Sequence, residues 1–174
     1  MPRELAITML IYHPAYDANH CIFRMLLLLS HSDPVVRIDE MKIMDFYVLF
    51  PHLLKSIRLP ARYNEYKKSF SKLPEPYEHT EKYIEIFHQL SEIQNAAIAN
   101  MLSKDILDID SYYEGKVKRS DNKLPESLSR HLKGCAYGDD MWFTFVAKEI
   151  PRIGINGPKG LKARTGLMEF RYDV

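Results

Sequence analysis

The stretch from Thr80 to Arg119 constrains the fold of this chain more than any other segment. Apolar residues recur at helical spacing on both sides of Ser91, and Ser91 with Gln94 three residues later forms a capping-box pattern. This pattern predicts two short helices that meet near Ser91. A charged turn and a basic segment follow, in which Gly115 stands where a hairpin would turn. Helix, break, helix and hairpin is the order of a winged helix.

Length and composition limit the class of protein. A chain of 174 residues with 46% hydrophobic and 27% charged residues has enough apolar material for one domain, which we expect to span residues 1–174. The net charge of +1 gives no overall attraction for nucleic acid, so any electrostatic site must be local. No apolar run approaches the roughly 20 residues of a membrane span, and no signal peptide is recognised. Cys21 and Cys135 form no CxxC pair, so we expect a reduced, cytoplasmic protein with no membrane contact.

Most of the remaining elements are predicted to be helices. Asp17 or Asn19 is expected to cap a helix that ends near Ser30, and the segment from Asp39 to Pro51 is apolar nearly all round, as expected at the centre of a core. Two further helices are expected, one from Leu124 to Gly134 and one capped by Asp139 and closed by Pro151. Short strands are predicted at the two ends of the chain, at Ala6–Tyr12 and within Gly160–Tyr172. The fold class is therefore α+β and mostly helical, with a winged-helix-like core and short N- and C-terminal strands.

The sequence offers no recognisable catalytic or metal site. It contains no GxSxG, Walker lysine loop, GxGxxG or HExxH motif. Two groups of metal-ligand residue types match neither zinc nor calcium spacing: His13, His20, Cys21 and His31; and Asp105, Asp108, Asp110 and Glu114. We therefore predict a protein that is not an enzyme and that needs no metal or cofactor.

Two short basic clusters are candidates for contact with DNA or phosphate. They comprise Lys116, Lys118, Arg119, Lys159, Lys162 and Arg164. Such side chains can bind phosphates without reading sequence, although charges of this kind more often belong to solvated loops. The helix predicted at Glu92–Ser103 contains no Arg or Lys, which favours protein contact over base reading.

Aromatic residues supply candidates for a protein interface. The chain has eleven Tyr and eight Met, residue types that are enriched in interfaces. The candidates are Tyr12, Tyr16, Tyr112, Tyr113, Phe170 and Tyr172. A terminal edge strand could also add to a partner's sheet through backbone hydrogen bonds.

Three segments resemble a known family. They are Tyr12-His13-Pro14-Ala15-Tyr16-Asp17, Ile43-Met44-Asp45-Phe46-Tyr47-Val48-Leu49-Phe50-Pro51-His52, and Gly160-Leu161-Lys162-Ala163-Arg164-Thr165-Gly166-Leu167 with Tyr172. They are similar to the middle component of bacterial ABC-three-component systems, a group that includes the Lamassu-type defence operons against phages and plasmids. The resemblance implies an adaptor that accompanies an SMC-like ABC ATPase and an effector, often a nuclease, in a position similar to that of the small winged-helix subunits of SMC complexes. It carries over no catalytic residue.

Three functions follow as hypotheses. The first is a non-catalytic adaptor that bridges the SMC-like ATPase and the effector nuclease, with DNA contact inside the complex. The second is a winged-helix transcriptional regulator that binds DNA as a homodimer through Lys116, Lys118 and Arg119. The third is a hydrolase whose site has no recognised motif.

Overall fold

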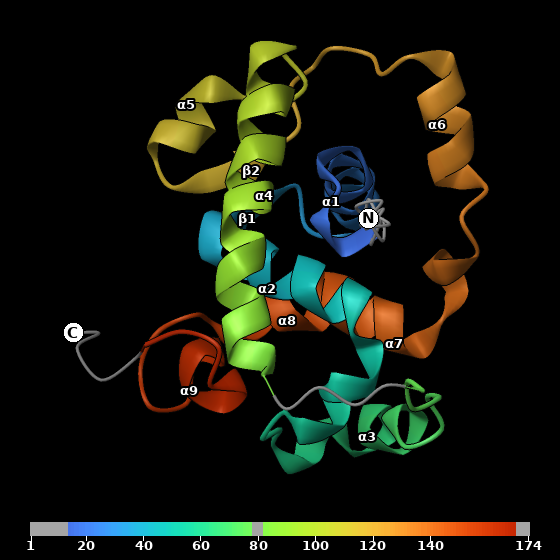
Figure 1. Ribbon diagram of the computed structural model, residues 1–174, viewed down its shortest axis with the longest axis vertical. Coiled ribbons are helices and arrows are strands. Elements are labelled where there is room, and N and C mark those ends of the chain that lie inside the picture. Colours follow the sequence, from blue (N-terminus) through green and yellow to red (C-terminus); the bar gives the residue numbers. More distant parts are fainter. Residues whose placement is uncertain (1–13, 78–81, 170–174) are drawn as a thin grey trace, which may run out of the picture.

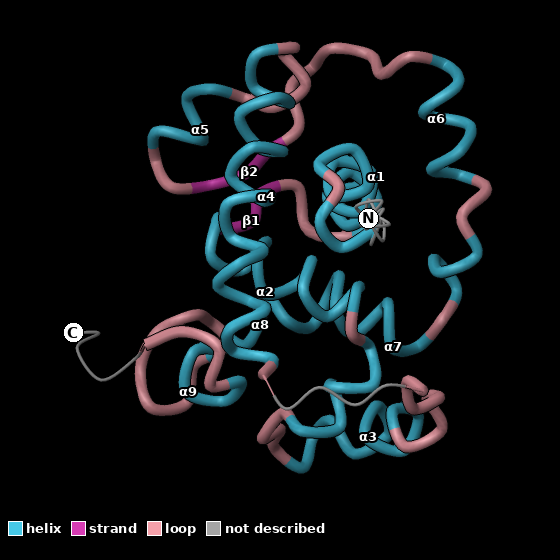
Figure 2. The backbone as a smooth tube through the Cα atoms, in the orientation of Figure 1, coloured by secondary structure: helices cyan, strands magenta, loops and turns pink. Residues whose placement is uncertain are grey.

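The computed structural model describes residues 14–77 and 82–169 (Figure 1). The described chain is mostly helical with one small antiparallel sheet, as the sequence predicts (Figure 2). Its α-helices and strands are α1 (Ala18–His31), β1 (Val35–Arg37), α2 (Ile38–Leu49), α3 (Asn64–Phe70), α4 (Tyr83–Ser103), α5 (Ile109–Tyr113), β2 (Lys116–Lys118), α6 (Glu126–Lys133), α7 (Met141–Thr144), α8 (Ile150–Ile153) and α9 (Leu161–Thr165). Short 3-10 turns lie at Pro14–Tyr16, Pro51–Ser56, Ala61–Tyr63 and Ala136–Asp139, and a π-helical turn lies at Phe145–Glu149. The strand predicted at Ala6–Tyr12 lies outside the described residues.

Helices α1, α2 and α4 build the centre of the core. Figure 1 shows α1 nearly end-on beside the upright α4, so these two helices cross steeply. The Asp17 carboxylate accepts hydrogen bonds from the backbone N–H groups of Asn19 and His20, which confirms Asp17 as the cap of α1. Phe46 of α2 packs edge to face against Phe87 of α4, with ring centroids 5.5 Å apart. Each fully buried side chain of this size contributes roughly 1.5–3 kcal/mol.

The central position of α2 confirms the prediction for the apolar segment between Asp39 and Pro51. Its buried residues face both sides, and Pro51 follows the helix, because a proline cannot continue the hydrogen-bond ladder. The start of the helix differs in one respect from the prediction. Glu40, rather than Asp39, satisfies the first backbone group, since its carboxylate accepts the N–H of Arg37 at 3.1 Å.

Helix α4 corrects the predicted break at Ser91. The helix runs without interruption from Tyr83 to Ser103, and Ser91 lies in its middle. The Ser91 hydroxyl accepts a hydrogen bond from Lys42 Nζ at 3.0 Å, so it joins α4 to α2 rather than capping a helix. The capping-box pattern was therefore misleading, because a mid-helix serine can serve a tertiary contact.

A buried polar cluster holds α1, α2 and α4 together. Asp45 of α2 is fully buried and receives Arg24 Nε at 2.7 Å and Arg24 Nη2 at 3.3 Å. Gln94 of α4 donates to the same carboxylate at 2.9 Å and to the Lys42 carbonyl at 3.1 Å. Cys21 of α1 lies 3.7 Å from Asp45, and burial, followed by the Asp45 charge, raises the pKa of its thiol. The thiol therefore stays neutral, as expected for a core cysteine.

The sheet corrects the predicted wing. Strand β2 pairs with the distant β1, with Val36 opposite Val117 and Arg37 opposite Lys116. Residues 106–108 run along the other edge of β2, where the Asp108 N–H donates to the Lys118 carbonyl at 2.9 Å. Gly115 ends α5, where its φ of +76° suits a glycine, instead of forming a tight hairpin. Residues 82–119 thus contain neither a separate recognition helix nor the predicted wing.

The last long helix continues past its predicted end. One continuous helix is formed by α7, the π-helical turn Phe145–Glu149 and α8. The residue that precedes it is Asp140 rather than the predicted Asp139. Pro151 lies inside this helix and has no N–H to donate, and the preceding residues widen into the π-helical turn, where the Ile150 N–H reaches the Phe145 carbonyl. The helix ends at Ile153 because Gly154 takes a φ of +82°.

The predicted C-terminal strand is a helix over residues 161–165. Helix α9 follows a tight loop in which Gly160 is essential: a Cβ there would lie 2.2 Å from the Asn156 carbonyl oxygen. The loop folds back so that the Gly154 carbonyl accepts the Leu161 N–H at 2.8 Å. The alternating residues of this segment reflect packing of Leu161 into the core, not a strand.

Candidate partner-binding surface

The structure brings one lysine from each predicted basic cluster to the same place. Lys116 of β2 and Lys162 of α9 line a cleft of about 520 Å³. Arg37 and Asp39 line it from the junction of β1 and α2, and Glu114 lines it from the end of α5. We call this site the cationic cleft; Ile38, Gly115, Ile155 and Asn156 complete its lining.

The charges of the cationic cleft are unevenly paired. Lys116 Nζ contacts Glu114 Oε2 at 2.8 Å, and Lys162 Nζ lies 4.0 Å from Asp39 Oδ2. The Arg37 guanidinium forms no ion pair with any residue in the described part of the chain, although it is exposed. The cleft therefore presents a guanidinium that is available to an anion.

Arg37 was missed in the sequence because its neighbours are distant along the chain. It faces Lys116 directly across the sheet, and like charges in that position repel one another. Only the pairing of β1 with β2 reveals the clustering. No local sequence signal distinguishes Arg37 from an ordinary surface arginine.

The other residues of the first basic cluster lie outside the cationic cleft. Lys118 is exposed on the same face of the sheet as Lys116. Arg119 is half-buried and donates to the Asn122 carbonyl at 2.9 Å, and burial lowers its pKa. Arg119 therefore holds the following loop and offers less of its guanidinium to a ligand.

The second basic cluster is also divided. Lys159 and Arg164 line a separate cleft of about 450 Å³ with Arg62. The Arg164 guanidinium donates to the carbonyls of Lys159 and Arg58, which ties α9 to the segment that follows Pro51–Ser56. The Leu161 and Lys162 N–H groups are already bonded to the Gly154 and Ile155 carbonyls, so these two groups of the glycine-rich loop are not open to phosphate.

Two predicted interface tyrosines form a protruding aromatic pair on α5. Tyr113 is 81% exposed and Tyr112 is 37% exposed, with ring centroids 6.2 Å apart. Asp108 fixes the start of α5 by accepting hydrogen bonds from the Ser111 hydroxyl and N–H, which lowers the Asp108 pKa. Figure 1 shows α5 standing out from the helical body. The pair is therefore exposed on a short, well-capped element.

Of the remaining predicted aromatic residues, one lies in the described part of the chain. Tyr16 is 46% exposed, and its hydroxyl donates to Gln89 of α4 at 3.2 Å. Tyr12, Phe170 and Tyr172 lie outside the described residues.

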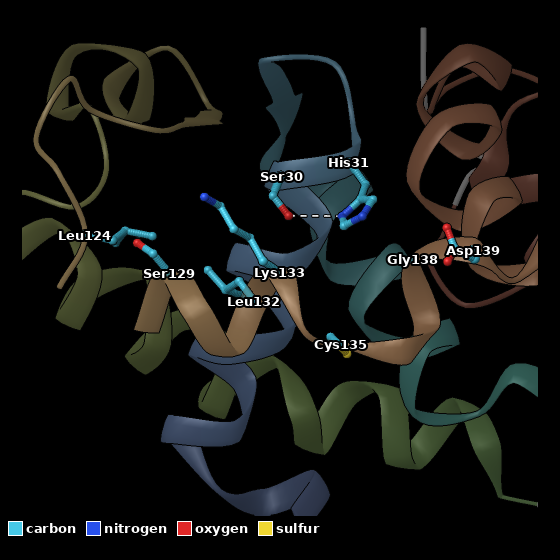
Figure 3. Close-up of a pocket in the computed structure, with 9 residues that line it drawn as sticks. All are labelled: Ser30, His31, Leu124, Ser129, Leu132, Lys133, Cys135, Gly138 and Asp139. Carbon is cyan, nitrogen blue, oxygen red and sulfur yellow. Dashed lines mark hydrogen bonds between the residues drawn. The ribbon is translucent and has the colours of Figure 1, made fainter. Parts of the chain in front are cut away.

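A second cavity of about 520 Å³ lies between the end of α1 and α6 (Figure 3). His31 Nδ1 must donate to the Leu27 carbonyl at 3.0 Å, since a carbonyl only accepts, and the ring packs against Phe143 and beside Gly138. Cys135 lines the cavity, but no hydrogen bond joins it to His31. The Ser30 hydroxyl lies 3.0 Å from His31 Nδ1 (Figure 3), but it donates to the Leu27 carbonyl at 2.7 Å, and an Nδ1 that carries a proton cannot act as its base. Within residues 14–77 and 82–169, no three His, Cys, Asp or Glu side chains are grouped to hold a metal.

Comparison with known proteins identifies the family. The family model described as ABC-three component (ABC-3C) system Middle Component 5 matches residues 10–173. The chain belongs to this family. No curated protein and no solved structure matches the chain. This middle component is thus one part of a multi-component system, as the sequence resemblance implied. Among its described helices, none combines the length and apolar character that crossing a membrane requires.

Proposed function

We propose that this middle component is a non-catalytic adaptor that bridges an SMC-like ABC ATPase and an effector nuclease in a cytoplasmic bacterial defence system of the Lamassu type. Family membership supports a role among several components. The aromatic pair Tyr112 and Tyr113 is the structural observation that carries the proposal, because exposed tyrosines on a fixed element are effective interface anchors. DNA contact within the complex stays a prediction for the members of the two basic clusters that lie outside the cationic cleft, chiefly Lys118, Lys159 and Arg164.

The geometry favours an adaptor over the two alternative functions. A winged-helix regulator needs a separate recognition helix, whereas Glu92–Ser103 is the second half of α4 and packs into the core through Ala97, Ile98 and Met101. A hydrolase needs a nucleophile activated by a base, whereas Cys21 is closed inside the helical core and the Ser30 hydroxyl beside His31 donates to the Leu27 carbonyl. Neither alternative gains a supporting observation from the fold.

Co-purification with the proteins encoded beside it tests the adaptor role. We expect a stable complex that contains a long coiled-coil ATPase, and we expect Tyr112→Ala with Tyr113→Ala to weaken it about tenfold or more. Tyr77→Ala is a matched control, because Tyr77 is fully exposed but lies on the separate loop after α3. If the wild-type chain forms no complex with either neighbour, the adaptor proposal fails.

A further inference from the structure

The cationic cleft differs from the rest of the charged surface because it concentrates cations that are distant in the sequence. Arg37, Lys116 and Lys162 come from β1, β2 and α9, and they share one concave site. Two acidic residues in the cleft each contact one lysine, and Arg37 has no ion pair within the described chain. The Glu40 carboxylate lies near Arg37 but is buried and bonded to its backbone N–H, so the exposed guanidinium has no ion pair with an acid of the cleft lining.

Two backbone hydrogen bonds hold the walls of the cleft in place. The Ile38 N–H donates to the Gly115 carbonyl at 3.0 Å, which fixes the start of α2 against the end of α5. The Lys162 N–H donates to the Ile155 carbonyl, which fixes α9 against its own loop. Lys162 lines the cleft and is largely buried, with 14% of its side chain exposed, so its position is more restricted than that of an exposed lysine. Lys162 therefore loses little side-chain entropy on binding, whereas the exposed Arg37 side chain must be ordered by the ligand.

A ligand at this site must be recognised mainly by side chains, because few backbone groups on the outer edge of β1 are free to form hydrogen bonds. Pro34 precedes the strand and has no N–H, and the Arg37 N–H is already bonded to Glu40. A strand of a partner protein could therefore pair with little of β1 beyond Val35. Addition of a strand to β1 does not explain the exposed charges.

We propose that the cationic cleft binds an acidic segment of a partner protein, with a carboxylate placed on Arg37. This inference rests on the adaptor function proposed above and assigns the chemistry of one of its contacts. A guanidinium binds a carboxylate through two parallel hydrogen bonds, and Lys116 and Lys162 line the same cleft as Arg37. The aromatic pair on α5 adjoins the cleft, since Glu114 and Gly115 follow it directly and line the site. The partner segment thus carries acidic residues beside apolar ones.

The interleaved acidic residues distinguish a protein ligand from nucleic acid. Asp39 and Glu114 line the same cleft, and they would repel the closely spaced phosphates of a duplex. A protein segment can place a basic or neutral residue opposite each acid, as complementary protein interfaces do. A concave site of about 520 Å³ also suits a few side chains better than the convex surface of a double helix.

Charge substitutions at Arg37 test the inference in the purified complex. Arg37→Ala is expected to weaken the affinity for the partner about tenfold, and Arg37→Glu more strongly. Arg37→Lys keeps the charge but loses the paired hydrogen bonds, so its affinity should lie between those of wild type and Arg37→Ala. Arg130→Ala is the control, since Arg130 is an exposed arginine on α6, which Figure 1 places on the opposite side of the molecule from α5. All four variants should keep the wild-type free energy of unfolding, because neither arginine is buried.

Carbodiimide cross-linking identifies the ligand directly, because it joins a lysine amine to a carboxylate with which it is in contact. We expect cross-links between Lys116 or Lys162 and an Asp or Glu of a partner subunit, and we expect Arg37→Glu to abolish them. If the wild type binds its partner and Arg37→Glu binds equally well, the acidic-segment inference is overturned while the adaptor function stands. If the Arg37-dependent association disappears after nuclease digestion, the anion is nucleic acid and the inference is likewise overturned. A wild-type chain that binds no component overturns both.

Discussion

The two arginines Arg24 and Arg37 show how the same side chain serves two purposes in this middle component. Arg24 lies in the buried polar cluster, where Asp45 accepts two of its hydrogen bonds and Gln94 fixes the carboxylate from α4. Arg37 lies in the cationic cleft, where it has no ion pair within the described chain and a lysine faces it across the sheet. The first arrangement is internally satisfied and selects one packing of three helices. The second places Lys116 opposite Arg37 across the sheet and leaves an exposed guanidinium without an ion pair, so it stays open to a further anion.

The largest expected effect comes from breaking the buried polar cluster. Asp45→Ala removes the carboxylate from a buried guanidinium and should lower the free energy of unfolding by about 3–5 kcal/mol. Urea denaturation measures this loss. Arg24→Met combined with Asp45→Ala should cost less than the sum of the single changes, since the second change removes the stranded charge.

Asp121→Ala is the matched control for this change, because Asp121 is exposed in the loop before α6. It should shift the free energy of unfolding by no more than about 0.5 kcal/mol. If Asp45→Ala lowers the free energy of unfolding by less than about 1 kcal/mol, solvent can replace the carboxylate at little cost. The buried polar cluster would then not be a stabilising counterpart to the exposed Arg37.

The sequence predicted the buried region far better than the exposed one, and the reason is physical. The apolar face of α1 and the nearly continuous apolar sequence of α2 predict these helices because burial against any core requires such residues, irrespective of the partner helix. The pairing of β1 with β2 depends on contacts between distant segments, so neither the role of Gly115 nor the position of Arg37 could be read locally. Ser91 illustrates the same limit inside a helix, because its pattern matched a cap while its hydroxyl bonds to Lys42. Residues 161–165 alternated as a strand would, yet the loop contacts of Gly160 select a helix.

A substitution at Gly160 tests how the cleft is built, with an intermediate expected effect. In Gly160→Ala the added methyl would lie 2.2 Å from the Asn156 oxygen and 2.7 Å from the Ile155 oxygen, and both residues line the cationic cleft. Displacement of this loop should cost about 1–3 kcal/mol of unfolding free energy and weaken partner binding together with it. Thermal denaturation and the binding assay report the two effects separately.

Gly134→Ala serves as the comparison for Gly160→Ala. Its added methyl would meet the Arg130 carbonyl at 3.4 Å, an ordinary contact, and the backbone φ of −84° suits any residue. Near-wild-type stability is expected there. Equal stability of both variants would show that the loop relaxes freely, and the cleft would then lack a fixed wall.

The smallest expected effect comes from Glu40, which lies between the two regions. Its carboxylate is buried at the start of α2 and accepts the Arg37 N–H, and burial raises its pKa more than this bond and the nearby Arg37 charge lower it. The folded state therefore holds the proton more tightly than the unfolded chain. Its contribution to stability is present below the ordinary carboxyl pKa of about 4.5 and is lost as the pH rises through the higher folded value.

Glu40→Gln keeps an acceptor for the Arg37 N–H but removes the buried charge. The variant should match the wild type in acid and should be more stable at neutral pH, with a flatter decline of stability between the two conditions. Urea denaturation across this pH range measures the difference, and Glu92→Gln on the exposed face of α4 should leave the profile unchanged. A neutral-pH stability of Glu40→Gln below that of the wild type would show that the charge at this helix start outweighs its desolvation. Glu40 would then resemble Asp45, as a buried charge that stabilises the fold. Arg37 alone would remain as the charged residue of this helix start that has no ion pair.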